Sequence, residues 1–561
     1  MAAYADLGSL EVADTRPAER AEGYRTRAKL VANARGQLGL YARGTHDLVD
    51  LPECRVLHPV LSGVAAALRA SIAGQPLEGV DMSLVGGQVM ITLIAAHDAE
   101  RGPLLELAAR LRARVPQLAS VAISRRKPGA VQLLGTQHEV VSGPPELQAS
   151  SPGAHVYHYA AHGAFQQVHA ETATSIYARV LERVRADAQA TTPRVLELYA
   201  GSGALSLALA AQGASVKAVE SFAPACERLT RAAREQALDV SVVAGDAGAV
   251  TRALAEQAER FDLVVVNPPR RGLDLDVRTA LAALAPHHLA YVSCNPLTLA
   301  RDLAQLARAG LSATRLEPFD MMPLTDQVET FAWMSRAPAP PPRVLWAEGE
   351  LFAVDQAAHE SASEAGVGSL WSRVRRLAGY AEAVPMFDID PNLSGVCLFA
   401  TSARAAEAIR PRLRRVEEVY WALAKGVVHK RGKIERPLAG RKRANAVCTR
   451  YERLEVRSGH SLVRAEREWV GSSGEWHASG PRSAQVREHL AMIGHPVIGD
   501  TRRADRATSR HFEMRHGLDR PFLHCQVVRF ELDGTSCEVE SPLPPDLSQV
   551  LRSLQTRLPP A

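Results

Sequence analysis

Apolar and polar positions alternate along the chain in two different ways. Over residues 192–335, apolar runs such as RVLELYA, SVKAVE and FDLVVVNPP are followed by longer amphipathic stretches rich in Ala, Leu and Arg. Strands that alternate with helices in this way are typical of a parallel sheet covered by helices. The pattern therefore predicts an α/β domain over residues 156–335.

The pattern is less regular on both sides of this segment. Residues 21–155 contain the strand-like runs QVMITLIAA and LASVAISRR around a helical LLELAARLRARV, which predicts a small α+β domain preceded by a tail, residues 1–20. The Pro-rich RAPAPPPR of residues 336–343 suits neither a helix interior nor a central strand. It predicts a linker to a further domain, residues 344–561.

Composition narrows the class of protein. With 561 residues, 46% of them apolar, the chain is long enough for several domains with separate cores. The net charge of +5 permits an RNA partner without requiring one. The seven cysteines are scattered, without CxxC pairs, which favours reduced thiols, a cytoplasmic protein and no metal site. The acidic N-terminus does not resemble a signal peptide, and no apolar run is long enough for a membrane.

The run LELYAGSGALSLALA, residues 196–210, predicts a strand, a Gly-Ser-Gly turn and a helix. Gly201 and Gly203 let the backbone approach a ligand, and Glu220 ends the next strand about 20 residues on, where a carboxylate can hold ribose hydroxyls. Asp246 follows the third strand. An ordinary strand-turn-helix is the alternative, but the three features together favour an adenosine-containing cofactor. Because the dinucleotide motif GxGxxG is incomplete, S-adenosylmethionine is favoured over NAD.

A second motif, VVVNPPRRG, ends the fourth predicted strand. Ligands of open α/β sheets lie outside the carboxyl ends of the strands, so Asn267 and the rigid turn after it are expected to face the site. An amide followed by two prolines can present polar groups to a planar ring. Arg270 and Arg271 are candidates for phosphate contacts, although exposed arginines are more often only solvated.

Cys294 follows the fifth predicted strand at the same edge of the sheet. A thiolate there can add to an electron-poor ring, and Glu329, at the start of the final strand, can serve as a base opposite it. A cysteine after an apolar run is more often an inert core residue. The neighbouring motifs reverse that preference and favour a nucleophile.

These motifs, ELYAGSG, FQQ (residues 165–167), NPPRRG, YVSCNP and FDMMPLTDQVET, resemble in order and spacing the bacterial uracil-5 RNA methyltransferases. The resemblance covers about residues 20–335 and implies a Rossmann-like, S-adenosylmethionine-dependent enzyme that makes 5-methyluridine in ribosomal or transfer RNA. Asn267, where much of the family has Asp, is closest to the branch that acts on 23S ribosomal RNA. The resemblance implies that Cys294 is the nucleophile and Glu329 the base. It also implies that the cofactor and uracil sites are lined by Gln166, Tyr199, Glu220 and Asn267.

The implied chemistry starts from the weak nucleophilicity of uracil carbon 5. Addition of the Cys294 thiolate at carbon 6 makes carbon 5 enolate-like, and Glu329 later removes the proton of carbon 5. The target uridine must leave its stack to be reached. The sequence departs from the family at Gln327, where a His is usual, and at Val168, where an Asn is usual. It also lacks the cysteine cluster that holds an iron–sulfur centre in many relatives.

The C-terminal half carries another set of motifs. MFDIDPNLSGVCLFA, VEEVYWALAKG, PRSAQVREHLAMIGHPVIGD and PFLHCQVVRFELDG resemble the RluA-like pseudouridine synthases over about residues 343–555. The resemblance implies an α+β domain with a mainly antiparallel sheet, in which Asp390 acts at the ribose, Tyr420 stacks or shuttles a proton and Arg487 pairs with Asp390. In isolation, the Asp before LSG is more often a turn residue.

This half departs further from the family that it resembles. The departures are Asp388 in place of an arginine, Glu418 in place of a lysine and Ala484 in place of a histidine. Two interpretations of this domain remain open: that it isomerises uridine, or that it has lost this activity and only binds RNA. Together, the two halves predict a cytoplasmic RNA-modifying enzyme that is, or once was, bifunctional, with structured RNA as its partner and neither a membrane nor a protein partner. A non-catalytic ribosome-assembly factor and a small-molecule methyltransferase with an unrelated appended domain are the alternatives.

Overall fold

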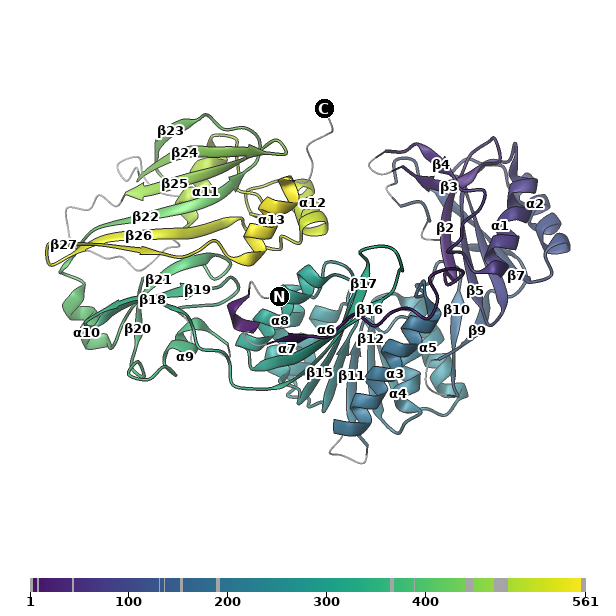
Figure 1. The fold of residues 1–561 in the computed structure, drawn as a ribbon, viewed down its shortest axis with the longest axis horizontal. Helices are drawn as coiled ribbons and strands as arrows, with labels where there is room; N and C mark the ends of the chain where they lie inside the picture. Colours follow the sequence, from purple (N-terminus) through teal and green to yellow (C-terminus); the bar gives the residue numbers. More distant parts are fainter. Residues whose placement is uncertain are drawn as a thin grey trace.

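The chain forms a small N-terminal domain, a central domain and a C-terminal domain, with the central domain between the other two (Figure 1). A computed structural model describes the chain except for residues 1–3, 8–9, 43–44, 131, 136, 152–154, 188–191, 364–367, 388, 439–446, 469–482 and 556–561. None of the described helices is long and apolar enough to cross a membrane.

The small domain packs two helices on one sheet. Across the sheet the strands are β4 (Leu48–Asp50), β3 (Leu38–Tyr41), β2 (Arg27–Ala32), β5 (Leu77–Val85), β6 (Gln88–Ala96), β7 (Leu118–Arg126) and β8 (Glu139–Ser142). Neighbouring strands are antiparallel except β6 and β7. Helices α1 (Pro59–Ile72) and α2 (Arg101–Arg114) bury leucines seven residues, or two turns, apart against the sheet, such as Leu61 and Leu68 on α1 and Leu104 and Leu111 on α2. This is the α+β arrangement that the sequence predicts for residues 21–155.

A hairpin joins the small domain to the central one. β9 (Glu146–Ser150) and β10 (Tyr157–Ala161) pair antiparallel, and β10 packs on helix α5 (Ala223–Glu235). The predicted boundary at residue 155 falls inside this hairpin.

The central domain is built on a twisted, mostly parallel sheet. Its strands, in spatial order, are β1 (Glu11–Val12), β16 (Leu311–Asp320), β17 (Val328–Arg336), β15 (His288–Ser293), β14 (Leu263–Val266), β11 (Arg194–Leu198), β12 (Ser215–Glu220) and β13 (Val240–Ala244). β11 to β15 are parallel, whereas β17 is antiparallel to both of its neighbours. The strand order reverses between β11 and β14, which is the place where open α/β sheets bind ligands.

Alternating residues of these strands face different helices. Leu196 and Leu198 share a core with α6 (Ala247–Glu256), α7 (Leu275–Leu284) and α8 (Pro296–Arg308), whereas Val195 packs with α3 (Ala170–Asp187) and α4 (Ala204–Ala210). Because successive side chains of a strand point to opposite faces, an almost continuous apolar run such as RVLEL fills both cores. The structure therefore has the α/β layers that the sequence pattern predicts.

The N-terminal segment belongs to the central sheet. Residues 1–20 are predicted as a tail, but β1 pairs in parallel with β16 and forms an edge of the sheet. Before it, Asp6 is 2.7 Å from Arg308 of α8 and 3.4 Å from Arg373 of the C-terminal domain. The segment is therefore part of the fold and ties two domains together.

The C-terminal domain has a mainly antiparallel sheet. Its strands run in the order β18 (Val344–Glu348), β19 (Leu351–Gln356), β21 (Ser394–Ala400), β26 (Leu523–Leu532), β22 (Leu413–Ala424), β25 (His460–Glu468), β24 (Val447–Arg457) and β23 (Arg431–Arg436), with β20 (Val384–Phe387) beside β21 and β27 (Thr535–Glu540) beside β26. Its helices are α9 (Leu370–Val374), α10 (Ala403–Ile409), α11 (Ser483–Met492), α12 (Arg506–His516) and α13 (Pro545–Gln555). The Pro-rich segment lies between β17 and β18.

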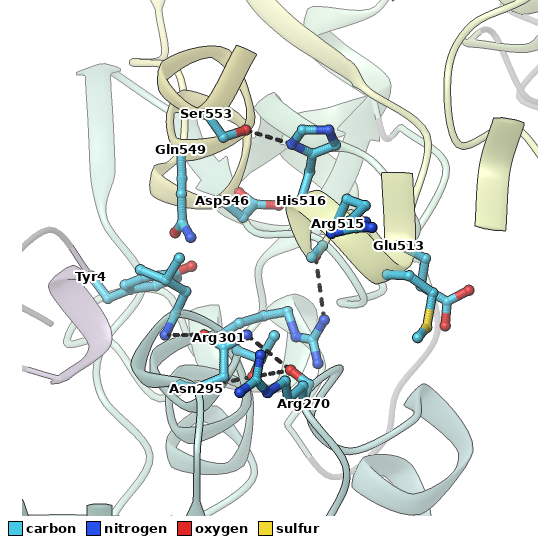
Figure 2. Close-up of a pocket in the computed structure, with 14 residues that line it drawn as sticks. Tyr4, Arg270, Asn295, Arg301, Glu513, Arg515, His516, Asp546, Gln549 and Ser553 are labelled. Carbon is cyan, nitrogen blue, oxygen red and sulfur yellow. Dashed lines mark hydrogen bonds between the residues drawn. The ribbon is translucent and has the colours of Figure 1, made fainter. Parts of the chain in front are cut away.

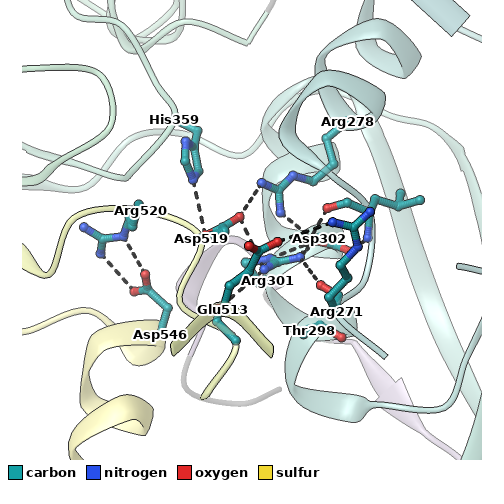
Figure 3. Close-up of polar contacts among 12 residues, drawn as sticks. Arg271, Arg278, Thr298, Arg301, Asp302, His359, Glu513, Asp519, Arg520 and Asp546 are labelled. Atoms are coloured by element: carbon teal, nitrogen blue, oxygen red, sulfur yellow. Dashed lines mark hydrogen bonds and ion pairs between the residues drawn. The ribbon is translucent and has the colours of Figure 1, made fainter. Parts of the chain in front are cut away.

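A buried network of ion pairs joins the central and C-terminal domains (Figure 3). The fully buried Arg278 lies 2.7 Å from Asp302 and 2.6 Å from Asp519, and Arg301 is 3.3 Å from Asp519. Burial alone would raise the pKa of Asp519, but Arg301 and Arg278 outweigh it and hold the pKa well below 3.8. The network fixes how the C-terminal domain sits against α7 and α8.

We expect Asp519→Ala to lower the free energy of unfolding at pH 7 by about 3 kcal/mol, because it removes one of the two carboxylates that balance the buried guanidinium groups of Arg278 and Arg301. A carboxylate whose pKa is lower in the folded than in the unfolded protein stabilises the fold at pH values above its pKa in the unfolded chain. This contribution is lost as the pH falls through its pKa in the folded protein. The difference between variant and wild type should therefore shrink below about pH 4. Urea unfolding at pH 7 and at about pH 3 measures both. Asp533→Ala, which removes an exposed ion pair with Arg412, is the control, with an expected cost below about 1 kcal/mol.

Candidate active site at the carboxyl edge of the central sheet

The turn after β11 contains two glycines that serve different purposes. Both have positive φ, +58° at Gly201 and +83° at Gly203. A Cβ at Gly203 would lie 2.1 Å from Leu229 Cδ1, so this glycine lets α4 pack against α5. A Cβ at Gly201 would meet nothing within 4 Å. Gly201 therefore borders open space at the point where the strand order reverses.

Two carboxylates follow the next two strands. Glu220 ends β12 and accepts hydrogen bonds from the backbone amides of Gly201, at 3.0 Å, and Phe222, at 2.8 Å. Asp246 follows β13 and caps α6 by accepting from Ala249 N at 3.0 Å. Carboxylate oxygens are the acceptors that ribose hydroxyls require, and each retains lone pairs for them. These residues fit the adenosine part of the predicted cofactor.

The remaining predicted cofactor residues lie on three segments. Tyr199 follows β11 and Asn267 follows β14, both half-buried at the carboxyl edge. Gln166 is half-buried in the segment between β10 and α3. Its neighbour Gln167 hydrogen-bonds Tyr177, and the charge of Glu329 helps to raise the pKa of that tyrosine, whose shift comes mainly from burial. The FQQ segment therefore lies near the end of the sheet where the predicted base stands.

Cys294 and Glu329 stand opposite each other on neighbouring strands. β15 pairs antiparallel with β17, with Ser293 opposite Thr330, so the next matching positions are Cys294 and Glu329. Burial and the charge of Glu329 raise the pKa of the Cys294 thiol, whereas the guanidinium of Arg270 lowers it. The net pKa lies above the usual value of 9.0, so the resting thiol is protonated at neutral pH.

Glu329 has the properties of a general base. Its side chain is buried, and burial raises its pKa to about 7, partly offset by Arg270. Its Oε2 atom is buried without a hydrogen-bond partner among the described residues. A carboxyl group that titrates near neutral pH, with an oxygen free to accept, is suited to taking a proton from a substrate.

Arg270 has a role that the sequence does not predict. It is exposed, as expected of a solvated arginine, but its guanidinium acts on both Cys294 and Glu329 and donates to Gln327 Oε1 at 3.0 Å. Gln327, at the position where the family usually has His, thus helps to hold Arg270. The sequence feature that could have indicated this role is that the motifs NPPRRG and YVSCNP follow adjacent strands, β14 and β15. A positive charge here favours the thiolate and the carboxylate over their neutral forms.

The predicted residues of the C-terminal domain divide into two groups. Asp390 and Arg487 form an ion pair of 2.9 Å, with little of either side chain exposed. Tyr420 is fully buried in the core, and its hydroxyl donates to Glu418 at 2.7 Å. In this conformation Tyr420 faces the interior, where it does not offer a stacking surface to a base. Asp388 lies outside the described residues.

Glu418, at a position where a lysine is expected, is paired within the sheet. Arg467 lies opposite it on β25 and is 3.0 Å from its carboxylate. The positive charge therefore comes from the neighbouring strand. No group of three or more His, Cys, Asp or Glu side chains in the described part of the chain is arranged to hold a metal ion.

Comparisons with known proteins show which family the chain is similar to. The family model tRNA (Uracil-5-)-methyltransferase matches residues 82–337. An uncharacterized RNA methyltransferase of Geobacter sulfurreducens is 32% identical over 348 residues, which cover 59% of this chain and 69% of the relative. The chain belongs to the RNA (uracil-5-)-methyltransferase family. This RNA methyltransferase therefore acts on RNA with S-adenosylmethionine as its methyl donor.

Two further relatives differ in the RNA that they modify. The 23S rRNA (uracil(1939)-C(5))-methyltransferase RlmD of Halomonas elongata is 34% identical over 339 residues, which cover 56% of this methyltransferase and 65% of the relative. The solved tRNA (uracil-54, C5)-methyltransferase of Pyrococcus abyssi, in complex with S-adenosyl-L-homocysteine, is 21% identical, with a TM-score of 0.48; the match covers 59% of this chain and 81% of that one. The family match ends at residue 337, before the C-terminal domain begins.

Proposed function

We propose that this protein methylates carbon 5 of a uridine in 23S ribosomal RNA, in the cytoplasm. The observation that carries the proposal is the facing pair of Cys294 and Glu329, with Arg270 beside both, at the carboxyl edge of the central sheet. Asn267 and the relative that acts on 23S RNA support ribosomal over transfer RNA. Seven free cysteines suit a reducing compartment.

The chain supplies a nucleophile and a base for this reaction. The Cys294 thiol first gives its proton to solvent. The thiolate then forms a bond to uracil carbon 6, and the electron pair of the ring double bond moves onto carbon 5 and the oxygen of the neighbouring carbonyl. When bound, S-adenosylmethionine supplies the electrophilic methyl group. Glu329 then accepts the proton of carbon 5, the double bond re-forms, and the bond between sulfur and carbon 6 breaks to restore the thiolate.

Residues that end or follow β11, β12, β13 and β14 would hold the cofactor. Glu220 would accept from the ribose hydroxyls, and the space beside Gly201 gives the cofactor access to the backbone of the turn. Tyr199, Asp246 and Asn267 stand at the ends of the neighbouring strands. The half-buried position of Cys294 requires the uridine to leave its stack in order to reach the thiol.

The test is a methylation assay with purified protein, tritiated S-adenosylmethionine and total RNA lacking 5-methyluridine. We expect tritium in 23S RNA and 5-methyluridine by nucleoside mass spectrometry. Tritium in the transfer RNA fraction instead would assign the transfer RNA substrate. No 5-methyluridine in any fraction, assembling ribosomal particles included, would contradict the methylation proposal. If pseudouridine were absent as well, the RNA-binding assembly factor would be the explanation.

A second candidate function belongs to the C-terminal domain. The Asp390–Arg487 ion pair is the observation that favours isomerisation of uridine to pseudouridine, because the arginine holds the carboxylate in place. We expect new pseudouridine in the same RNA and its loss in Asp390→Ala. Asp533→Ala, an exposed aspartate of the same domain, should leave it unchanged. Pseudouridine that persists in Asp390→Ala, or never forms with wild type, contradicts this activity.

A further inference from the structure

Helix α12 runs from one candidate site toward the other. Its amino end follows the turn in which Asp500 lies 3.9 Å from Arg487, the partner of Asp390. Its carboxyl end lies against the central domain, where Glu513 is 3.5 Å from Arg271. Eleven helical residues span about 16 Å, so this one element joins the surroundings of both sites.

The solvent-facing side of α12 carries positive charge without acidic partners. Arg506 and Arg510 are exposed and one turn apart, on the side away from the buried Phe512. The exposed Arg502 lies in the turn before the helix, and the exposed Arg515, nine residues after Arg506, lies on the opposite face at the carboxyl end. No ion pair is recorded for these four arginines among the described residues. Like charges four residues apart destabilise an isolated helix, so the pair of Arg506 and Arg510 makes physical sense when an anion lies along it.

An open pocket lies at the carboxyl end of α12, between the two domains (Figure 2). From the central domain it is lined by residues on the loops that also form the candidate active site, including Arg270 and Asn295, the residue after the nucleophile. From the C-terminal domain it is lined by Arg515 and His516, among others. The pocket therefore lies between the carboxyl end of α12 and the loop that follows Cys294.

The charges of this pocket leave a positive excess. Its two acids are both engaged, Glu513 with Arg271 at 3.5 Å and Asp546 with Arg520 at 2.6 Å. Arg270, by contrast, donates to the neutral amide of Gln327. Arg515 has no ion pair with an acid among the described residues. Guanidinium groups at such a place suit phosphate, which they bind with two parallel hydrogen bonds.

We propose that α12 is an RNA-backbone ridge, on which the neighbouring Arg506 and Arg510 bind phosphates of the RNA, with Arg502 before the ridge and Arg515 at its carboxyl end. The strand then passes through the interdomain pocket, where Arg270 meets the phosphate beside the target uridine. This inference rests on the proposed methylation of RNA and adds that the C-terminal domain forms part of the methyltransferase's RNA-binding surface. Because the buried network of Arg278 and Asp519 holds the two domains together, the ridge has a fixed position relative to Cys294.

The test is the double variant Arg506→Glu and Arg510→Glu. We expect its affinity for total ribosomal RNA, measured by fluorescence anisotropy, to fall at least 10-fold. The slope of log K against log salt should fall by about 1.5, because each lost phosphate contact removes about 0.7–0.9. KM for RNA should rise at least 10-fold, while kcat at saturating RNA stays within 2-fold. The matched control is Arg234→Glu with Arg260→Glu, two exposed arginines near the opposite edge of the central sheet.

The possible outcomes separate this inference from the proposed function. Unchanged affinity and KM in the α12 variant, or an equal loss in the control, overturns the ridge. If wild type makes no 5-methyluridine while only the α12 variant loses RNA affinity, the methylation proposal fails and the ridge stands. The neutral double variant Arg506→Gln and Arg510→Gln, with an unchanged unfolding temperature, should show a smaller loss in the same direction. The absence of any loss with this folded variant also contradicts the ridge.

Discussion

Replacing Cys294 with alanine is expected to abolish 5-methyluridine formation, with a fall in kcat on the order of 10⁴-fold or more. Carbon 5 of uracil is too weak a nucleophile to take the methyl group unaided, and the activation comes from the sulfur–carbon bond. The affinity for RNA should stay within 2-fold, because the thiol forms its bond only after the RNA has bound. Tritium incorporation and anisotropy binding on the same preparation measure the two quantities.

The control for this variant is Cys54→Ala, which removes a half-buried thiol of the small domain. It should methylate RNA at the wild-type rate. Retention of activity in Cys294→Ala would make the thiol a packing residue. A cell that needs the protein but tolerates Cys294→Ala would favour the assembly factor.

Replacing Glu329 with glutamine is expected to stop the reaction after the methyl group has been transferred. The amide cannot accept the proton of carbon 5, so the sulfur–carbon bond cannot be eliminated, and turnover should fall about 10²–10⁴-fold. A covalent complex of protein and methylated RNA should accumulate and resist denaturing electrophoresis. The complex should disappear in Glu329→Gln combined with Cys294→Ala. Rapid turnover by Glu329→Gln would assign the base to another group.

The same variant has an opposite effect on stability. The pKa of Glu329 is about 7 in the folded protein, against an ordinary value of 4.5 in the unfolded chain, so the folded protein binds the proton more tightly. Its favourable contribution is complete below pH 4.5 and is lost as the pH rises through 7. Glu329→Gln should therefore be more stable than wild type at pH 8, by up to about 3 kcal/mol, and equal to it near pH 4.5. Urea unfolding at the two pH values measures the difference.

The layers of the fold are predictable because their signal is local. Each of the strands β11 to β15 is an apolar run followed within a few residues by its helix, and the period of each segment decides its type. The strand β1 is not predictable in this way. It has only two residues, Glu11 and Val12, both exposed, and its neighbour β16 lies about 300 residues away. Nothing near residue 11 indicates that pairing.

The candidate site is predictable as far as strand order fixes it. The carboxyl ends of β14 and β15 meet at one edge, so motifs that follow these strands must come together, as Asn267 and Cys294 do. The balance of charge is not predictable, because it depends on side-chain directions. The guanidinium of Arg270 turns toward Cys294 and Glu329, and Arg467 compensates Glu418 across a strand pair. To predict either contact, the register of the strands must be known as well as their order.

The N-terminal segment makes the last stage of folding depend on the order of synthesis. Asp6 bonds Arg308 and Arg373 across 302 and 367 residues of chain, and β1 needs β16. These residues leave the ribosome long before their neighbours exist, so the small domain can fold while the segment is still unpaired. Contacts between such distant residues form slowly, because a long loop must close first. The segment that ties the two later domains together therefore reaches its native position only after both have been made.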